Sequence, residues 1–468
     1  MGIGIKLKGA YDVLFGRAIP TPLKNNLIQY QQQQTMMLQG IAVYGKDNAA
    51  QQVQTYITND DIYSITRRIA KTAATIPLYV YKIKDDKKFK QYESLLKQKS
   101  YTPEHRVKMM ILKEQALELV PDNDPYQTLL DNPNRNYDKT EFKEGFYGFR
   151  LLTGNGYIYT PTLDLGPNAG KVSEMWLLPS QYTQPKILQS FPREITSYQL
   201  TIFAIIDLPK EEVAHSRYFN PDFDAIGSEL VGLSPLTAGA KVIQRSYDET
   251  NYMVAGFQNS GISGIVANEG VSNEDVTPEI LGKLKSDFYQ EGTGVHNARK
   301  LLFQAGKINY IQIGLGPVDM DVINSQKLTF KKLCNLYGVD DRLFNNDTTG
   351  SENSVEIMER ALYLNAALPE VYALRDTLNK HLSPKFSTKG VKYFVDADIS
   401  DITVLQSDMK KMAEVFSAVP FIKGNLIAEA LGVGRSDDPL MDKWFIKTGY
   451  VPLEDTETLP PIDNTGDY

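Results

Sequence analysis

Cysteine and histidine are scarce in this sequence of 468 residues, and their scarcity excludes several kinds of site. Cys334 is the only cysteine, so no intrachain disulfide can form, and we expect the chain to fold in a reducing, intracellular compartment. Four scattered histidines and no cysteine pair argue against a zinc site. No apolar run approaches the roughly 20 residues that a membrane helix needs, and the start, MGIGIKLKGAYDV, lacks a signal-peptide core. These absences predict a globular protein with no membrane partner.

Positive charge is also in deficit. The chain has 50 Lys and Arg against 57 Asp and Glu, a net charge of −7, whereas proteins that grip nucleic acid use clustered Lys and Arg. The distribution is uneven, because residues 82–113 carry ten basic and four acidic side chains, and residues 394–468 carry six and fourteen. A solvated charged insertion and an acidic tail are the plain interpretation of these two runs.

The first half of the chain predicts a mixed α+β domain after a Gln-rich arm. We expect residues 1–59 to be extended or to depend on a partner for structure. Apolar spacing predicts a helix from Asp60, capped by Asp60 or Asp61, which Pro77 ends before the strand LYVYK. Residues 84–120 are interpreted as a basic insertion with a helix at 103–118. A helix over 139–155 then precedes strand patterns, including a hairpin-like pair of strands within 166–187.

Three long helical patterns dominate the second half. Ser234 is a cap and Pro235 a first helical residue for a helix of about six turns that reaches residue 258. A second helix covers 319–337, and a third covers 354–381, where Pro369 removes a backbone donor and predicts a kink. Between the first two lies a strand, helix and strand insert. The acidic end predicts a helix at 403–417 and a short helix, NLIAEALG, stopped by Gly432.

A search for catalytic, metal-binding or cofactor-binding motifs predicts none. GPNAGKV has three residues between its glycines where a phosphate-binding loop needs four, and a hairpin turn explains it better. His215 lies near Asp222 and Asp224 in sequence, but no G-x-S-x-G elbow accompanies it, which favours a structural hydrogen bond. DADISD, residues 396–401, could bind Mg²⁺ through carboxylates, although helix capping needs fewer assumptions.

The order of several short stretches carries a family resemblance. These stretches are ITRRIAKTAATIPLYVYK, LLDNPN, LLTGNGYIY, GKVSEMWLLPSQY, HSRYF leading to GLSPLTAGAKVI, LCNLYGVDDRLF, ENSVEIMERALYLNAALPEVYALRDTLNKHL and FIKGNLIAEALGV. In this order and spacing, over residues 60–450, the chain resembles the portal proteins of tailed bacteriophages, of the HK97-like type. Residues 84–120 and the Gln-rich arm depart from the family pattern.

The resemblance implies an α+β portal-type fold and a non-enzymatic function. A ring of twelve copies at one capsid vertex of the virion, assembled in the host cytoplasm, would let double-stranded DNA enter and leave without sequence specificity. The implied partners are the terminase large subunit, a head–tail adaptor, and the major capsid and scaffolding proteins. The implied division of the chain is an arm (1–59), a mixed α/β wing (60–230), a first stem helix (231–258), a small α/β clip (259–317), a second stem helix (318–340), a tunnel loop (341–353), a kinked wing helix and strand (354–393), and a mainly helical crown (394–468).

By the same resemblance, the polar run after Phe344 would lie at the narrowest point of the channel. Its expected DNA-facing residues are Asn345, Asn346, Asp347, Thr348, Thr349, Ser351 and Asn353. Neutral amides and hydroxyls with one carboxylate would touch phosphates weakly, whereas a collar of Lys and Arg would hold a duplex that carries one phosphate per ~1.7 Å. An ordinary surface turn between helices is the alternative, since Asn, Asp and Gly favour turns anywhere.

Basic side chains on the expected stem helices are candidate channel charges: Lys241, Arg245, Lys327, Lys331 and Lys332. They could guide DNA sparsely or form ion pairs with a neighbouring subunit. Two other functions stay open on the sequence. One is a collar or ring component of a virion that passes no DNA, and the other is a hydrolase that uses His215 with nearby carboxylates.

Overall fold

The computed structural model describes most of the chain from Ala49 onward. The described residues are 49–98, 103–162, 171–258 without 189, 203 and 225–226, 264–268, 279, 282, 286, 308–312, 322–344, 352–399 without 389, 402–405, 421–430, 436–446 and 451–452. They fall into two compact units. The first lies within Met1–Ile65 and Pro235–Asp341, and the second within Thr66–Ser234 and Arg342–Tyr468.

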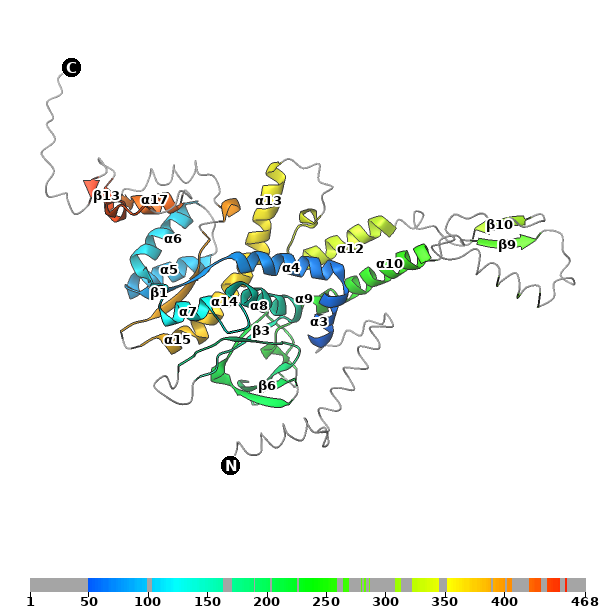
Figure 1. Ribbon diagram of the computed structural model, residues 1–468, viewed down its shortest axis with the longest axis horizontal. Helices are drawn as coiled ribbons and strands as arrows, with labels where there is room; N and C mark the ends of the chain where they lie inside the picture. The colour runs from blue at the N-terminus through cyan, green and yellow to red at the C-terminus, as the bar shows by residue number, and fades with distance from the viewer. Residues whose placement is uncertain are drawn as a thin grey trace, which may run out of the picture. The chain divides into compact units, whose positions relative to one another are not determined.

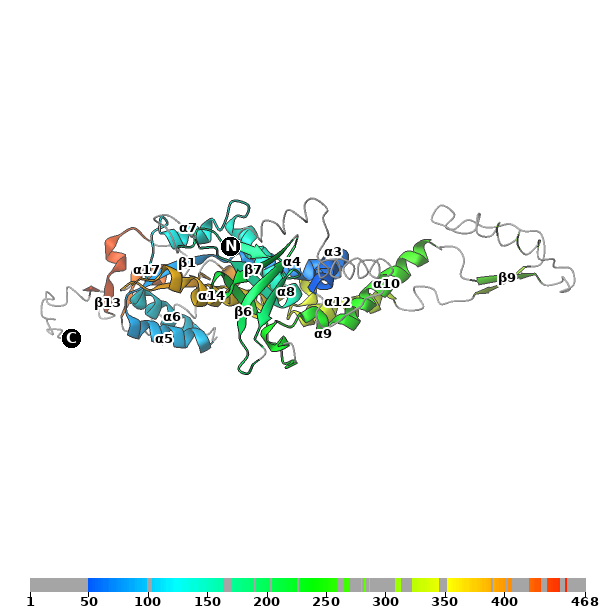
Figure 2. The ribbon, with the colours of Figure 1, turned by 90° about the horizontal axis from the view of Figure 1, so that it is seen from below.

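The first unit is built mainly from helices. Its elements are α3 (Ala49–Thr58), the first residues of α4 (Asp60–Thr75), α9 (Pro235–Ala238), α10 (Ala240–Gln258), α12 (Val322–Leu336) and the antiparallel strands β9 (Gly264–Asn268) and β10 (Ile308–Gln312). Helices α10 and α12 lie side by side (Figures 1 and 2). Ile243 of α10 and Leu333 of α12 are fully buried, so an apolar stripe on each helix holds the unit together.

Two sequence-based expectations for this unit differ from the structure. The expected arm, residues 1–59, ends in a regular helix, α3, over residues 49–58. The cap of α4 is Asn59 and not Asp60 or Asp61, because the Asn59 side chain accepts a hydrogen bond from the backbone N–H of Ile62 at 3.0 Å. Gln51, Gln52 and Thr55 of α3 are buried, which shows that polar side chains form its inner face. An apolar-periodicity argument therefore missed this helix.

The helix expected from 234 to 258 is split in two. Pro235 begins α9 as predicted, but α9 ends at Ala238 and α10 begins at Ala240. A Cβ on the intervening Gly239 would lie 2.4 Å from Cδ1 of Leu336. The glycine at the break thus allows α12 to approach more closely than any larger residue would permit.

The second unit contains four small antiparallel sheets with helices against them. Their strands are, in spatial order, β11 (Tyr393–Ala397), β1 (Leu78–Ile83) and β2 (Leu117–Leu119); β4 (Trp176–Leu178), β3 (Asn155–Tyr159) and β8 (Val213–Arg217); β5 (Thr183–Ile187), β6 (Ile195–Thr201) and β7 (Ile205–Pro209); and β12 (Phe421–Lys423), β13 (Trp444–Ile446) and β14 (Val451–Pro452). The hairpin expected within 166–187 does not form, because β4 pairs with β3 and β5 pairs with β6.

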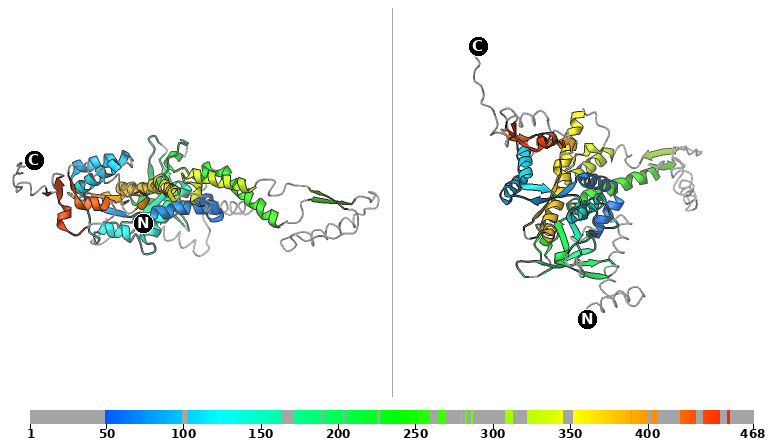
Figure 3. Two further views of the ribbon diagram at one scale, coloured as in Figure 1. Left: turned by 90° about the horizontal axis from the view of Figure 1, so that it is seen from above. Right: turned by 60° about the vertical axis from the view of Figure 1, so that its left-hand side comes forward.

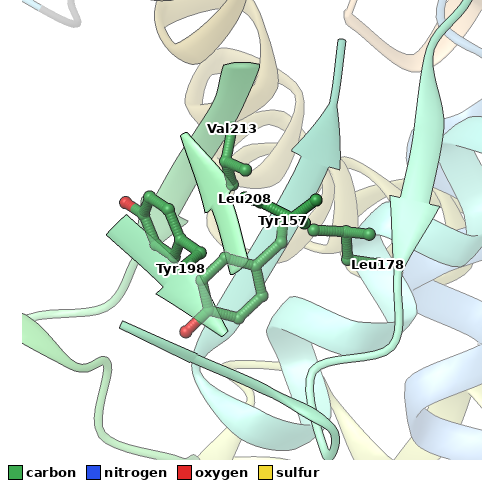
Figure 4. Close-up of a cluster of buried hydrophobic side chains, with 5 residues drawn as sticks. All are labelled: Tyr157, Leu178, Tyr198, Leu208 and Val213. Atoms are coloured by element: carbon green, nitrogen blue, oxygen red, sulfur yellow. The ribbon is translucent and has the colours of Figure 1, made fainter. Parts of the chain in front are cut away.

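The aromatic core of the β5–β6–β7 and β4–β3–β8 sheets is shown in Figure 4. It contains Tyr157, Leu178, Tyr198, Leu208 and Val213, all at most 8% exposed. Tyr157 and Tyr198 meet edge to face with ring centroids 5.8 Å apart, a favourable aromatic geometry. This cluster joins strands from both sheets.

The helices of the second unit cover these sheets. They are α5 (Asp86–Gln98), α6 (Pro103–Ala116), α7 (Pro125–Asp131), α8 (Lys139–Thr153), α13 (Glu352–Leu362), α14 (Leu368–His381), α15 (Ser383–Phe386) and α17 (Gly424–Ala430), with short 3₁₀ turns η1 (Lys210–Glu212), η2 (Ser228–Leu230), η4 (Asp341–Leu343), η6 (Thr403–Leu405) and η7 (Pro439–Asp442). Helix α14 contacts both β11 and β8. It therefore links two of the sheets.

The basic insertion, residues 84–120, is a packed helical hairpin and not a loose solvated segment. It contains α5, which the sequence analysis missed, as well as the expected helix, α6. Tyr92 and Ala116 are fully buried, and Phe89 packs edge to face on Phe394 of β11 with centroids 4.9 Å apart. The insertion thus shares a core with the β11–β1–β2 sheet.

The acidic end also differs from expectation. Strand β11 crosses the boundary placed between residues 393 and 394 and pairs with β1, so residues 393–397 extend the sheet of the expected wing. The expected mainly helical crown includes, among its described residues, the three-stranded sheet β12–β13–β14 beside α17. Most of the helix expected at 403–417 lies outside the described residues, as does Gly432, and only Thr403–Leu405 is described there, as a 3₁₀ turn. Figure 3 shows this sheet (orange to red) beside α5 and α6 (blue to cyan).

Candidate functional site

The helix pair α10 and α12 carries a polar cluster between its two helices. Arg245 Nε lies 2.8 Å from Glu249 Oε1, one helical turn along α10. Arg245 also donates to the hydroxyl of Ser325 on α12, and that hydroxyl donates to Glu249. Burial alone would raise the pKa of Glu249, but hydrogen bonds from Ser325 and Arg245 hold that pKa below its usual value. Glu249 therefore stays ionised and paired.

This cluster changes the interpretation of Arg245. As an expected channel charge it would face DNA, but its guanidinium is bonded to Glu249 and Ser325 within its own chain. Arg245 therefore links α10 to α12 by hydrogen bonds within its own chain. A pair of this exposure contributes of the order of 1 kcal/mol or less to stability.

The other four expected channel charges are differently placed. Lys241 on α10 and Lys327, Lys331 and Lys332 on α12 are exposed. None of the four forms an ion pair with another described residue of the chain. Lys327 and Lys331 are four residues apart and so lie on one face of α12. These ammonium groups are available to a partner.

Exposed apolar side chains accompany the lysines on the same two helices. Ile323 and Leu328 of α12 are 57% and 47% exposed, and Tyr252 and Val254 of α10 are 39% and 46% exposed. Exposed apolar side chains rimmed by polar ones mark interaction surfaces when they form a patch.

The start of α10 is tied to α3 and α4 by hydrogen bonds. The Asn59 amide donates to the hydroxyl of Ser246 at 3.2 Å, and that hydroxyl donates to Asp61 at 2.8 Å. Thr58 and Tyr247 share a hydrogen bond of 2.6 Å. Burial raises the pKa of Asp61, and the bond from Ser246 opposes that rise. Small polar groups therefore position α10.

The expected tunnel loop is described only at its edges. Asp341–Leu343 form a 3₁₀ turn, and residues 345–351 lie outside the described residues. Six of its seven expected DNA-facing residues fall there: Asn345, Asn346, Asp347, Thr348, Thr349 and Ser351. Asn353, the seventh, lies in the first turn of α13, because that helix begins at Glu352. Helix α13 thus begins two residues before the start at residue 354 that the sequence predicted.

Pro369 was expected to kink the helix that follows the loop. Here α13 ends at Leu362, a π-helical turn covers Tyr363–Ala367, and α14 begins at Leu368 with Pro369 in its first turn. The helix is continuous here, because the N–H of Leu368 bonds to the carbonyl of Tyr363 five residues earlier, and Pro369 has no N–H to continue this bonding. The irregularity therefore lies before the proline.

A buried ion pair holds the start of α14 against α8. Arg150 Nε lies 2.8 Å from Glu370 Oε2, and both side chains are less than 10% exposed. Tyr218 donates to Glu370 Oε1 at 2.7 Å, and Arg150 donates to Ser216 at 3.0 Å. Burial raises the pKa of Glu370, and the charge of Arg150 opposes this. Each charged group of this ion pair is bonded to the other and to a further hydroxyl group, as a buried ion pair requires.

A second buried cluster is centred on Asp396 of β11. Its carboxylate lies 3.1 Å from Lys113 Nζ and 3.5 Å from Arg375 Nη1, and it accepts a hydrogen bond from the Tyr92 hydroxyl. Burial would raise the pKa of Asp396, but the charges of Lys113 and Arg375 hold it below its usual value. The sequence analysis treated this aspartate as a helix cap or Mg²⁺ ligand. It is instead the anion that joins α5, α6 and α14.

His215 has a structural environment. Its Nε2 lies 3.0 Å from Oδ1 of Asn155, and its ring stacks on Tyr157 with centroids 4.3 Å apart. Burial, with the nearby charges of Arg217 and Arg150, lowers the pKa of His215 to about 3. Asp224, one of the carboxylates considered as its partner, instead accepts the backbone N–H groups of the turn that follows it. The histidine is therefore a neutral packing residue.

Other chemistry is also accounted for within the described residues. They contain no group of three or more His, Cys, Asp or Glu side chains placed to hold a metal ion. No helix among them has the length and apolar character to cross a membrane. Cys334 is buried, and burial raises the pKa of its thiol to about 12. The glycine-rich run 166–172 lies mostly outside the described part, although Val172 forms a bridge with Thr162.

Comparison with known families identifies the class of this protein. The model of the phage portal protein family matches residues 107–420. This match spans well over half of the sequence, and the chain therefore belongs to the phage portal protein family, as the order of its motifs predicted.

Relatives in sequence and structure are distant. An uncharacterized protein of Rickettsia bellii is 24% identical over 304 residues, which is 63% of this chain and 74% of the relative. Another, from Rickettsia felis, is 23% identical over 326 residues, 67% of this chain and 79% of the relative. A chain from the neck of a native gene transfer agent particle, computed with C12 symmetry, has a TM-score of 0.55 and 19% identity, with 85% of this chain and 96% of that chain covered. The fold is thus a mixed α/β fold with small sheets, similar to that neck protein.

Proposed function

We propose that the chain is a portal subunit that assembles into a ring, the conduit through which double-stranded DNA enters and leaves a virus-like particle. The observation that carries the proposal is the family match over residues 107–420. The fold likeness to a neck protein of a C12-symmetric particle supports a ring of many copies. Exposed lysines and apolar side chains on α10 and α12 supply surface for contacts between subunits. The function is structural, and no catalysis is required of it.

The finer assignments rest on resemblance to HK97-like portals. In that arrangement twelve subunits occupy one capsid vertex, α10 and α12 form the stem, and residues 259–317 form the clip that docks the terminase large subunit and later the head–tail adaptor. Capsid and scaffolding proteins would contact the outer parts of the ring. Residues 345–353 would form the narrowest collar of the channel.

The charge balance suits a conduit. A net charge of −7 per chain becomes about −84 in a ring of twelve, which repels a polyanion from most of the wall. Asn345, Thr348 and their polar neighbours offer no cation that would release counterions from DNA, so a duplex can slide past. Lys241, Lys327, Lys331 and Lys332 are described stem cations that remain free to guide DNA or to pair with a neighbouring subunit.

The two other functions considered from the sequence are weaker. A hydrolase would need His215 as a base, but this histidine bonds to Asn155 and has a pKa of about 3, too low for a base that works near neutrality. A collar component that passes no DNA would also form a ring, and purified particles separate the two, because a portal is expected as one ring per head that binds terminase.

Electron microscopy of the purified protein tests the proposal directly. We expect annular particles with an axial hole, and a protein that stays monomeric at assembly concentrations would overturn it. A variant with residues 345–353 replaced by a Gly/Ser linker of equal length should still form rings but should package or retain DNA poorly. Loss of rings in that variant would show that the loop is structural.

Neutralising Lys331 and Lys332 together distinguishes the two uses of the stem lysines. Unchanged DNA packaging with less stable rings would assign them to contacts between subunits. Stable rings that package DNA slowly would assign them to the channel. The matched control is neutralisation of Lys71, an exposed lysine on α4.

A further inference from the structure

The start of α5 carries a group of lysines that the rest of the described chain does not neutralise. We call it the lysine face, and it consists of Lys84, Lys87, Lys88 and Lys90. Three of the four are exposed and the fourth, Lys88, is half-buried. None of them forms an ion pair with another described residue.

The acidic side chains beside the lysine face are already engaged elsewhere. Asp85 caps α5 by accepting the backbone N–H groups of Lys87 and Lys88, at 2.8 and 3.1 Å. Asp86 pairs with Lys392 at 2.9 Å, and Glu93 pairs with Lys97 at 3.1 Å. The lysine face therefore keeps its net positive charge.

These lysines are costly where they are. Lys87 and Lys88 lie in the first turn of α5, at the positive end of the helix dipole, where cations are disfavoured. Lys87 and Lys90, three residues apart, lie on the side of α5 away from the core residues Phe89, Tyr92 and Leu95. Half-buried Lys88 is one turn before Tyr92 and lies at the edge of the packed side. Asp85 at the cap and Asp86 in the first turn offset part of this cost, and the four lysines still leave an excess of positive charge that a partner of opposite charge would stabilise.

A segment with complementary charge follows the last described strand. Residues 453–468 contain no Lys or Arg and five carboxylates: Glu454, Asp455, Glu457, Asp463 and Asp467. The segment begins directly after β14, at the C-terminal sheet β12–β13–β14. Its attachment point is therefore known from the fold, and its charge is opposite to that of the lysine face.

The C-terminal sheet is fixed to the same helical hairpin that bears the lysine face. Lys423 Nζ of β12 lies 2.8 Å from Glu114 Oε1 of α6 and 5.3 Å from the ring centre of Trp444 on β13. Helix α6 contacts both α17 and α5, and the views of Figure 3 show the sheet beside these helices. Because β14 pairs with β13 and β13 with β12, the end of β14 at Pro452 belongs to a sheet that contacts α6.

The segment is long enough to reach the lysine face. Packed helices lie about 8–10 Å apart, so crossing from α17 over α6 to α5 takes roughly 20 Å, and following the 13 residues of α5 adds about another 20 Å. Sixteen extended residues span about 50 Å.

We propose that residues 453–468 dock on the lysine face of their own chain, with their carboxylates against Lys84, Lys87, Lys88 and Lys90. The contact neutralises a basic surface of a chain whose net charge is −7. It also keeps that surface from binding nucleic acid non-specifically. Because the charges are exposed, the contact weakens as salt rises above about 0.15 M, where screening acts within 8 Å.

Zero-length carbodiimide coupling, which joins a lysine to a carboxylate it touches, tests this contact in the full-length protein. A one-to-one mixture of ¹⁵N-labelled and unlabelled protein is coupled at low salt and analysed by mass spectrometry. We expect lysine-face cross-links to residues 454–467 within one isotopic species, reduced at least tenfold in 0.5 M NaCl. Mixed-isotope cross-links in the 1:2:1 ratio that contacts between chains give, cross-links only to carboxylates elsewhere, or no cross-links would overturn the proposal.

Lysine acetylation gives an independent readout with an internal control. In a variant with the five carboxylates changed to Asn or Gln, we expect Lys87 and Lys90 to react several-fold faster, while the exposed Lys71 reacts at an unchanged rate. The same variant should also gain affinity for a 30-base-pair duplex at low salt. Equal reactivity of Lys87 and Lys90 in both proteins, or DNA protection of these lysines in the unmodified protein, would refute the docking.

Discussion

Replacing Asp396 by Asn should destabilise the second unit far more than replacing Asp376 by Asn. Both carboxylates lie against Arg375, but in opposite environments. The Asp396 side chain is 4% exposed and also pairs with Lys113, whereas Asp376 is 66% exposed and lies 2.8 Å from Arg375 Nη2. The pair of variants therefore compares a buried and an exposed anion on one guanidinium.

The expected magnitudes follow from burial. Asp396→Asn leaves the ammonium of Lys113 and the guanidinium of Arg375 without their buried counter-charge, which costs about 3–5 kcal/mol. The amide of the new Asn can still accept from Tyr92, so little of this cost comes from that hydrogen bond. Asp376→Asn removes an exposed pair and should cost at most about 1 kcal/mol.

Urea unfolding followed by tryptophan fluorescence measures this difference. The chain has two tryptophans, Trp176 and Trp444, and both lie in the second unit. Protein concentration is held constant, because assembly would shift the apparent stability. Hydrogen exchange adds a local measurement, and Asp396→Asn should increase exchange in α5 and α6, where Lys113 lies.

The double variant Lys113→Met with Asp396→Asn completes the test. Arg375 then keeps Asp376 as its partner, and no buried ammonium remains unpaired. We expect it to be more stable than Asp396→Asn alone, with a coupling energy of about 1 kcal/mol or more. If Asp396→Asn and Asp376→Asn differ by less than about 0.5 kcal/mol, the cluster does not hold the insertion in place and our account of it is wrong.

Two further predictions concern packing and acid stability. Gly239→Ala should destabilise the first unit by about 1–2 kcal/mol, because its methyl group would lie 2.4 Å from Cδ1 of Leu336. Gly148→Ala should be neutral or stabilising by up to about 1 kcal/mol, because no described atom lies within 4 Å of the new Cβ. Urea melts of the two variants measure this difference, and equal effects would contradict the prediction. Burial lowers the pKa of His215 to about 3 and that of His381 to about 4, both below the usual 6.5. The free energy of unfolding should therefore be highest above pH 6.5. It should decrease as the pH falls toward 4, by up to about 1.4 kcal/mol per pH unit for each histidine. His381→Gln should flatten this slope in melts between pH 4.5 and 6.5, and an unchanged slope would contradict the assigned pKa.

Apolar periodicity predicted several helices with apolar inner faces, although it missed α5, which packs through Phe89, Tyr92 and Leu95. Helix α4 was predicted because Ile62, Ile65 and Ile69 repeat at helical spacing, and all three are fully buried. Phe146 of α8, which was also predicted, is fully buried too. Helix α3 was missed because its buried face is made of Gln and Thr, which no hydrophobic pattern detects. The family order of motifs predicted membership that no single motif could.

Buried charge was the main failure of the sequence analysis. Charged residues are rarely buried, so Lys113 was assigned to a solvated basic run and Asp396 to a helix cap or Mg²⁺ site in an acidic run. Their pairing joins positions 283 residues apart, and a single sequence contains no signal of that distance. A usable hint existed in β11, where Asp396 interrupts the apolar strand YFVDA at a position that a buried strand would fill with Val or Ile.

Both buried ion clusters converge on α14, and this has a mechanical consequence for the proposed channel. Arg150 holds Glu370 at the start of α14, and Arg375, five residues later, holds Asp396. Helix α13, which begins just after the expected DNA-facing loop, is separated from α14 by the π-helical turn Tyr363–Ala367. Charges fixed on the side of α14 resist its movement, whereas the π turn offers a place where helical hydrogen bonding already changes register. Displacement of the loop by passing DNA would thus be absorbed between α13 and α14, and the sheets beneath α14 would stay in place.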